Sequence, residues 1–386
     1  MELLVVIAII GLLVALLLPA LSSARQSAIA ATANTSLAGF GRSFLITADQ
    51  DVAERGQLSS GAFDHSRDGD VRRYGWVADV IKNKVLNPGK ALDASNPSKV
   101  NEKVADYTGA ATTGTVNPKR WKGATSAVHF GGASGPADVT DDVGKRKVWD
   151  DGHNTNFATS WHFSRGDMRT SGTTPNSGNF STADPSKCPL DGDGPLSESK
   201  LMKCAVSRDL IACVANSRNG DSGDSTVTDT YALAINTFCG RDGTSTDEAP
   251  ICKAGDFTVE SFTDGMSATM IETVATNVGL AGSTTEPQRL HEHNDFVPIV
   301  GGRKTGDGLY AGGSCQMLFA DGHVAKIIDK GGRGDEADGW IGAYKPVGST
   351  SLQLNDSAFN EVRNQVWLRH LGDGTRLGAG GTNVED

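Results

Sequence analysis

The sequence predicts an α+β protein in which a long hydrophobic amino-terminal helix precedes a loop-rich, mainly antiparallel β head. Residues 3–24 carry no charge, whereas the whole chain of 386 residues has a formal net charge of −10. The chain contains 47 glycines, and its later apolar runs have the length of single strands. We therefore divide the chain into a helix at residues 1–50 and a head at residues 51–386. The head exceeds a usual single core, so it is either one domain with long insertions or two lobes.

The first apolar run has the length and composition of one membrane-spanning helix. Fourteen of residues 3–21 are Leu, Ile or Val, which favours insertion by about 4 to 8 kcal/mol. At about 1.5 Å per residue this run spans roughly 28 Å, close to the hydrocarbon core of a bilayer. A cleaved secretory signal is the alternative. It is disfavoured because no Lys or Arg precedes the run and residues 21–24 match a cleavage site poorly.

Two residues are unusual in this helix. A carboxylate beside an apolar helix start is costly in lipid, so Glu2 is either functional or solvated at the headgroup level. Pro19 removes one backbone hydrogen bond and predicts a kink or local melting. Beyond residue 21 the apolar spacing predicts an amphipathic continuation towards Asp51, although Gly39 and Gly41 weaken it. The positions that carry this spacing are Ala24, Ala28, Ala31, Leu37, Phe40, Phe44 and Ala48.

Short apolar runs bounded by Gly, Asp or Asn predict the strands of the head. They lie at residues 127–130, 231–235, 269–274, 316–319 and 324–328. The last two form a hairpin if Asp321 and Gly322 make a two-residue turn with positive φ at both positions. We favour this turn over a catalytic role for Asp321. A second turn is predicted at Asp264 and Gly265, before a strand that places Glu272 on one face, and a short helix at residues 357–371.

All six cysteines lie between Cys188 and Cys315. None has C-x-x-C spacing, so a zinc site is not expected. An extracytoplasmic head would allow up to three disulfides. Proximity in the sequence suggests the pairs Cys204–Cys213 and Cys239–Cys252, and free buried thiols are the alternative. The six candidates are Cys188, Cys204, Cys213, Cys239, Cys252 and Cys315.

Acid-rich loops are the best candidates for a metal, and Ca²⁺ is the cation that they would suit. The pairs are Asp191 with Asp193 and Asp221 with Asp224, although solvated surface loops are the favoured interpretation. His291 and His293 would share a strand face and could ligate a metal.

Other classes of function receive no support from the sequence. No nucleophile elbow, Walker-type loop or dinucleotide fingerprint is present. The isoelectric point of about 5.3 disfavours a nucleic-acid partner. We therefore expect no enzymatic activity and no certain cofactor.

The stretch from Glu2 to Leu21 closely resembles the amino terminus of type IV pilins and type II secretion pseudopilins. Glu2 matches that family's glutamate, Pro19 matches its helix-breaking proline, and Gly11 lies between them. The resemblance implies that these residues serve assembly, and that prepilin peptidase and an inner-membrane assembly machinery are partners. The family's basic leader does not appear in this sequence, so cleavage and amino-terminal methylation cannot be read from it.

Two later stretches resemble a pseudopilin-like family of Planctomycetes that carries a His, nine residues and then Asp-Gly. Residues 262–272 are similar to one landmark of that family, through Asp264, Gly265 and Glu272. Residues 317–324 are similar to that family's closing strand and contain Asp321, Gly322 and His323. These three residues directly follow Phe319 and Ala320. The family's histidine would fall at Ala311, so no role tied to that histidine is expected here.

Together these resemblances imply a structural subunit of a type IV pilus-like or type II secretion pseudopilus-like filament. Copies of the chain would assemble through the amino-terminal helix, with the heads exposed in the periplasm or outside the cell. Before assembly the helix would lie in inner-membrane lipid. The alternative is a membrane-anchored extracytoplasmic domain that binds a ligand or hydrolyses a substrate.

Overall fold

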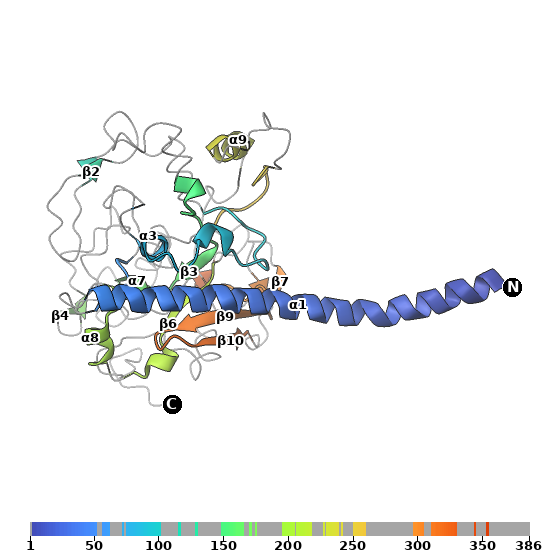
Figure 1. Cartoon of the computed structure of the whole chain (residues 1–386), viewed down its shortest axis with the longest axis horizontal. Coiled ribbons are helices and arrows are strands. Elements are labelled where there is room, and N and C mark those ends of the chain that lie inside the picture. Colours follow the sequence, from blue (N-terminus) through green and yellow to red (C-terminus); the bar gives the residue numbers. More distant parts are fainter. Residues whose placement is uncertain are drawn as a thin grey trace.

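A long helix lying against a small antiparallel sheet is the main feature of the computed structural model (Figure 1). The predictions at Asp264, Gly265, Glu272 and residues 357–371 lie outside the residues that the structure describes. The described residues are 2–51, 56–61, 72, 75–101, 115–116, 128–129, 148–165, 170–171, 174–175, 195–204, 206–217, 227, 229–238, 241, 250–259, 296–304, 310–329, 343–344 and 353–354.

Helix α1 (Glu2–Gln50) confirms the predicted amino-terminal helix and its continuation towards Asp51. Its first half projects away from the head, and its second half lies against the sheet (Figure 1). The helix is not interrupted at Pro19, contrary to the expected local melting, and the projecting half curves only gently. Leucine and alanine are strong helix formers, so the single hydrogen bond lost at Pro19 does not end the helix.

The main sheet has four strands in the order β10-β9-β6-β3, and all neighbours are antiparallel. The two central strands are buried at every position because the sheet has core on both faces. The predicted strands at residues 316–319 and 324–328 are confirmed. The four strands are β3 (Phe157–Thr159), β6 (Ala212–Asn216), β9 (Ser314–Phe319) and β10 (Val324–Ile328).

The remaining described strands form four two-residue pairs. The strand predicted at residues 127–130 appears as β2 over its two described residues. The pairs are β1 (Thr115–Val116) with β2 (Val128–His129), β4 (Thr170–Ser171) with β5 (Thr174–Pro175), β7 (Arg303–Lys304) with β8 (Tyr310–Ala311), and β11 (Ala343–Tyr344) with β12 (Gln353–Leu354).

The other described helices are short and surround α1 and the sheet. Two begin at capping side chains: Ser197 Oγ accepts a hydrogen bond from Lys200 N at 3.3 Å, and Asn87 Oδ1 accepts one from Lys90 N at 3.1 Å. The helices are α3 (Trp76–Lys82), α7 (Trp161–Arg165), α8 (Glu198–Leu201), α9 (Asp229–Phe238) and the 3₁₀ turns η2 (Pro88–Lys90) and η5 (Arg208–Leu210).

Helix α9 corrects the strand predicted at residues 231–235. Ala232, Ile235 and Asn236 are buried, whereas Leu233 is 60% exposed, which is the spacing of a helix face. Asn236 also fixes the following segment, because its side chain donates to Cys252 O at 2.8 Å and accepts from Ile251 N at 2.9 Å. A five-residue apolar run is compatible with either element, and here the tertiary contacts select the helix.

A β-bulge in β6 distributes the sheet's side chains between two cores. The register shifts between Ala212 and Val214, so Cys213 is the additional residue. Cys213 and Val214 belong to the core under α1, while Ala212 and Ala215 belong to the core on the opposite face. The bulge thus allows two consecutive side chains of a short strand to pack below the helix.

The β9–β10 turn confirms the predicted hairpin but not its type. Phe319 N donates to His323 O at 3.0 Å, and Gly322 N donates to Phe319 O at 2.9 Å. The loop therefore has three residues, and only Gly322 has a positive φ, at 89°. Asp321 therefore does not adopt the left-handed backbone conformation that a two-residue turn would require of it. It instead accepts a hydrogen bond from His323 N at 3.1 Å.

We expect Gly322→Ala to lower the free energy of unfolding by about 1 kcal/mol, because an L side chain is strained at this positive φ. A Cβ there would meet no atom within 4 Å, so the loss reports backbone strain alone. Urea unfolding of the full chain in detergent measures it. Gly322→Asn is the matched control, since asparagine tolerates the left-handed region, and equal losses for both variants would contradict the interpretation.

Candidate functional site

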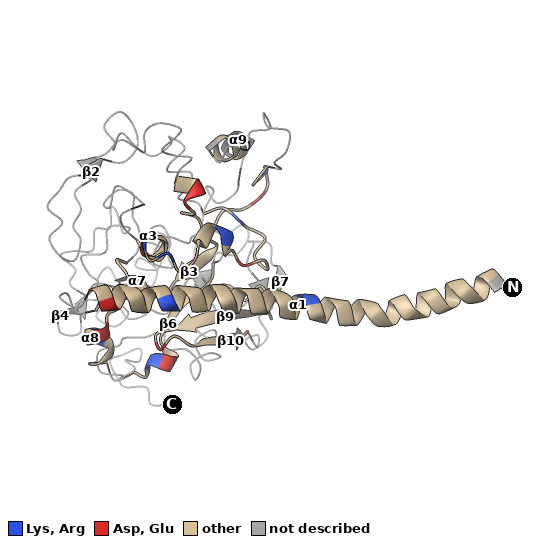
Figure 2. Ribbon diagram, in the orientation of Figure 1, with Lys and Arg blue, Asp and Glu red and all other residues tan. Residues whose placement is uncertain are grey.

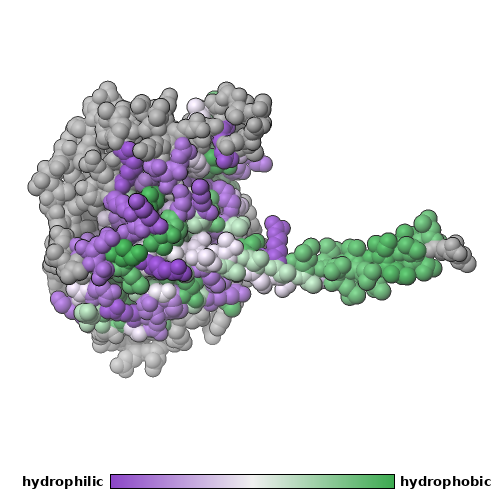
Figure 3. Space-filling view, in the orientation of Figure 1, coloured by the Kyte–Doolittle hydropathy of each residue, from purple (hydrophilic) through white to green (hydrophobic). Residues whose placement is uncertain are grey.

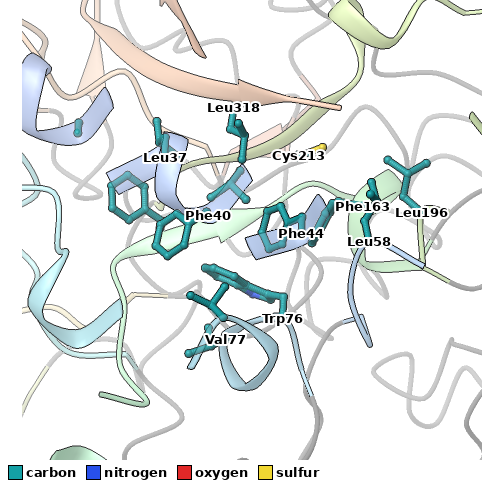
Figure 4. Packing of buried hydrophobic residues seen from close by; sticks show 14 of the residues in the cluster. Leu37, Phe40, Phe44, Leu58, Trp76, Val77, Phe163, Leu196, Cys213 and Leu318 are labelled. Carbon is teal, nitrogen blue, oxygen red and sulfur yellow. The ribbon is translucent and has the colours of Figure 1, made fainter. Parts of the chain in front are cut away.

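The second half of α1 is the central part of the head's core. Five of its hydrophobic residues are buried at spacings of three or four, which places them on one helix face. Figure 4 shows three of them between the sheet and the helices around it. This face, which we call the seat of α1, consists of Ala33, Leu37, Phe40, Phe44 and Ala48.

Aromatic contacts join the seat to three other elements. Phe40 lies edge-on to Trp76 of α3 and to Phe157 of β3, with ring centroids 5.4 Å apart in both cases. Phe44 lies 4.4 Å from Phe163 of α7 and 6.3 Å from Trp76. Such pairs stabilise beyond the area that they bury, so α1 is held by side chains from α3, β3 and α7 together.

A glycine on α1 permits close contact with the sheet. A Cβ at Gly41 would lie 3.1 Å from Leu318 Cδ1 of β9 and 3.9 Å from Gly322 Cα in the β9–β10 turn. Gly39 likewise faces Leu86, which occupies the space of a Cβ. These two glycines weaken the intrinsic helix propensity, as expected, but they allow neighbouring elements to approach the helix axis.

Polar contacts fix the rotation of α1 about its own axis. The side-chain amide of Asn83, just after α3, lies 2.9 Å from Ser43 O, 3.0 Å from Ser43 Oγ and 2.8 Å from Thr47 Oγ1. Ser43 is fully buried, so its hydroxyl has a partner where water is excluded. The seat is therefore specified by directional contacts as well as by apolar packing.

The first half of α1 presents apolar side chains on all sides. Every residue from 3 to 28 is exposed, and Leu3 reaches 78%. Figure 3 shows this part as a continuous hydrophobic rod that leaves a mixed polar surface. Within the described residues, α1 is the one helix long and apolar enough to cross a membrane. It fits a membrane anchor or a signal sequence.

The sequence-predicted assembly residues all lie on the projecting half. Glu2 is the first residue of α1, Gly11 has no atom within 4 Å of its Cβ position, and Pro19 is inside the helix.

Of Asp321, Gly322 and His323, which carry the resemblance to the pseudopilin-like family, Gly322 lies close to α1, with its Cα 3.9 Å from the position of a Cβ at Gly41. The ring of His323 stacks on Phe319 at 4.5 Å, and its Nδ1 lies 2.5 Å from Asp321 Oδ1. Ala311, at the position of the family's histidine, ends β8 opposite Arg303. Asp321, Gly322 and His323 belong to the β9–β10 turn, which approaches α1 at Gly322.

The described cysteines are free thiols, which corrects the suggested disulfides. Cys204 and Cys213 are both unbonded, and so is Cys252, the proposed partner of Cys239. Cys204 Sγ donates instead to Val206 O at 3.2 Å, while Cys213 is held inside the bulge of β6. Sequence proximity does not bring them together, because the intervening residues lead from the surface into a buried strand. Cys315 is likewise a free, buried thiol.

Burial keeps the thiols of Cys213, Cys252 and Cys315 protonated. It raises the pKa of Cys252 to about 11, with a smaller contribution from Asp256. Burial also raises the pKa values of Cys213 and Cys315. A thiolate is the reactive form, so these residues act as small apolar side chains in the core.

A buried network of amides around Asp93 was not predicted from the sequence. Asp93 N donates to Asn156 Oδ1 at 2.8 Å, and Asn216 Nδ2 of β6 donates to Asp93 Oδ2 at 2.8 Å. Ser95 donates to Asp93 Oδ1 from both its N and its Oγ, each at 2.7 Å. Asn96 Nδ2 reaches Asn216 Oδ1 at 2.9 Å. The network fixes the segment after η2 to the end of the sheet.

Burial raises the pKa of Asp93, although the hydrogen bonds from Ser95 and the charge of Lys99 oppose the rise. Burial also lowers the pKa of Lys99, which donates to the backbone carbonyls of Asp93 and Asn96. Burial of the Asp93 side chain therefore costs desolvation free energy, and the hydrogen bonds that it accepts offset part of that cost.

The pH dependence of stability tests this burial. A carboxyl whose pKa is raised on folding contributes stability below its unfolded pKa, and that contribution is lost as pH rises. We therefore expect the urea midpoint of the wild type to fall relative to that of Asp93→Asn as pH rises from about 4 to 7. Parallel midpoints across this range would contradict a raised pKa.

The remaining predicted site residues lie outside the described residues. They are Cys188, Cys239, Asp191, Asp193, Asp221, Asp224, His291 and His293. Within the residues that are described, no group of three or more His, Cys, Asp or Glu side chains is placed to hold a metal. Comparisons with protein-family models, curated proteins and solved structures found no match to this chain.

Proposed function

We propose that this protein is a structural subunit of a type IV pilus-like or type II secretion pseudopilus-like filament. One observation carries the proposal: α1 is a single helix whose second half is head core and whose first half is apolar and exposed. A generic anchor needs only a flexible connection to its domain. Here the apolar rod is instead held in a fixed direction relative to the head, as a repeating assembly requires.

The exposed half of α1 has two environments that satisfy its side chains. Before assembly it is surrounded by inner-membrane lipid, and in a filament neighbouring copies of α1 replace that lipid through close packing. Glu2 and Pro19 support this exchange. A carboxylate in an apolar helix bundle pairs with a positive group and thereby fixes the register, at a cost in desolvation. The missing hydrogen bond at Pro19 makes the helix easier to bend during the exchange.

The proposed partners follow from this role. They are further copies of the chain, a prepilin peptidase and an inner-membrane assembly machinery, with the head exposed in the periplasm or outside the cell. The role requires neither a cofactor nor a catalytic residue. The large head suits a minor or specialised subunit.

Shearing of cells that produce the full chain tests the proposal. We expect the sheared fraction to contain fibres, and electron cryo-microscopy to place α1 in the fibre core with the heads outside. A chain that stays in the membrane as a monomer would contradict the proposal. It would favour a membrane-anchored domain that binds a ligand or hydrolyses a substrate.

A further inference from the structure

Arg25 is the only charged residue between Leu3 and Gly41. It is exposed on the projecting half of α1, and Figure 2 shows how little charge this half carries. Among the residues that the structure describes, no carboxylate forms an ion pair with it. The guanidinium therefore presents its N–H donors to the surroundings of the helix, at the end of a long apolar segment.

Two further polar side chains share a helix face with Arg25. Ser22 lies three residues before Arg25, and Gln26 lies four residues after Ser22. Both are exposed, and within the described part of the chain neither side chain forms a hydrogen bond. The hydroxyls of Ser27 and Thr32 differ, because each donates to a backbone carbonyl of the preceding turn at 3.0 Å. We call Ser22, Arg25 and Gln26 the collar of α1.

The collar lies at the height where the hydrocarbon of a bilayer ends. The axial rise from Leu3 to Ser22 is about 28 Å, and the hydrocarbon core of a bilayer is about 30 Å thick. An arginine inside hydrocarbon costs several kcal/mol, whereas an arginine at the membrane surface keeps its charge solvated. When the apolar run spans the bilayer, the collar therefore lies among the lipid headgroups.

The head begins directly beyond the collar. Ile29 and Ala30 are half-buried and Ala33 is buried, so burial along α1 starts one turn after Arg25. This turn rises about 6 Å, and the headgroup layer on each side of a bilayer is roughly 5–8 Å thick. The collar thus occupies the layer between the hydrocarbon and the head, and the anions of that layer are phospholipid phosphates.

We propose that the collar binds the phosphate of a membrane phospholipid and thereby fixes the height of the head above the bilayer. The planar guanidinium of Arg25 donates two parallel hydrogen bonds to the phosphate oxygens, and Ser22 and Gln26 add neutral donors beside it. This inference rests on the membrane stage of the proposed function and names the ligand that holds the helix before assembly. It does not require the filament.

Solid-state NMR of the full chain in phosphatidylcholine vesicles tests the contact. Arginines carry ¹³C at Cζ, the lipid supplies ³¹P, and lipid is in large excess so that copies stay apart. We expect ³¹P to dephase part of the Cζ signal of the wild type, and Arg25→Gln to remove at least about half of that dephasing. Arg42→Gln is the matched control and should leave it unchanged, because Arg42 lies about 25 Å further along α1.

The two neutral donors are tested in the same vesicles. We expect the double variant Ser22→Ala with Gln26→Ala to weaken the dephasing about twofold, because Arg25 then holds the phosphate alone. Ser27→Ala is the control, since the hydroxyl of Ser27 is already bonded to the backbone. Equal dephasing in the double variant and the control would overturn the three-residue site.

The outcomes separate the phosphate site from the filament. An inserted chain whose dephasing does not change in Arg25→Gln would overturn the site and leave the filament standing. A wild type that does not float with the vesicles would overturn both the site and the membrane stage of the proposed function. An Arg25–phosphate contact in a chain that gives no fibres on shearing would support the site and overturn the filament alone.

Discussion

Phe40→Ala is expected to lower the free energy of unfolding by about 3–5 kcal/mol, the range measured for buried aromatic residues. The ring of Phe40 is fully buried and lies edge-on to both Trp76 and Phe157. Its removal leaves a cavity where α1, α3 and β3 meet, and none of these elements can move in without losing other contacts. Urea unfolding of the full chain in detergent, followed by tryptophan fluorescence, measures the change.

Leu45→Ala is the matched control for this prediction, because it lies on the same helix but is 49% exposed. It should change the free energy of unfolding by no more than about 0.5 kcal/mol. Similar losses in the two variants would show that the seat does not hold α1 in the head.

Glu2→Ala is expected to leave the head folded and to remove at least about nine-tenths of the filament, since an unpaired charge in an apolar bundle is strongly destabilising. Glu2 begins the projecting half of α1, far along the helix from the seat, so its loss cannot disturb the core. The amount of chain in the sheared fraction measures assembly, and limited proteolysis of the same cells measures head folding.

Leu3→Ala provides the control for Glu2→Ala, because it changes the adjacent residue without removing a charge. This variant should assemble. Normal fibres from Glu2→Ala would show that the carboxylate has no part in assembly, and joint loss of fibres and head folding would show that its effect is indirect.

The long-range features predicted from the sequence were those with a strong periodic signal. The helix and its continuation were predicted because apolar residues recur through Leu37, Phe40 and Phe44 at helical spacing. The β9–β10 hairpin was predicted because two strand-length runs flank Asp321 and Gly322. In each case the local pattern and the buried face agree, which is the condition under which sequence patterns are informative.

Features decided by tertiary contacts were not predicted. The run at residues 231–235 became helix α9 because contacts of Asn236 with the segment around Cys252 select that form. Asn156 and Asn216 meet through Asp93, from which they are separated by 63 and 123 positions. No periodicity connects such residues, so only the folded chain shows that they belong together.

The continuity of α1 has a mechanical consequence. The apolar rod and the seat belong to the same helix, so no extensible linker separates the projecting half of α1 from the head, and in the proposed filament none would separate the core from the head. Tension along a fibre would reach the head as a shear load parallel to the helix axis. The seat extends from Ala33 to Ala48, about 22 Å, and its contacts would bear that load at the same time rather than one after another. A subunit built in this way would resist extraction of α1 from the head, because all contacts of the seat would have to break together.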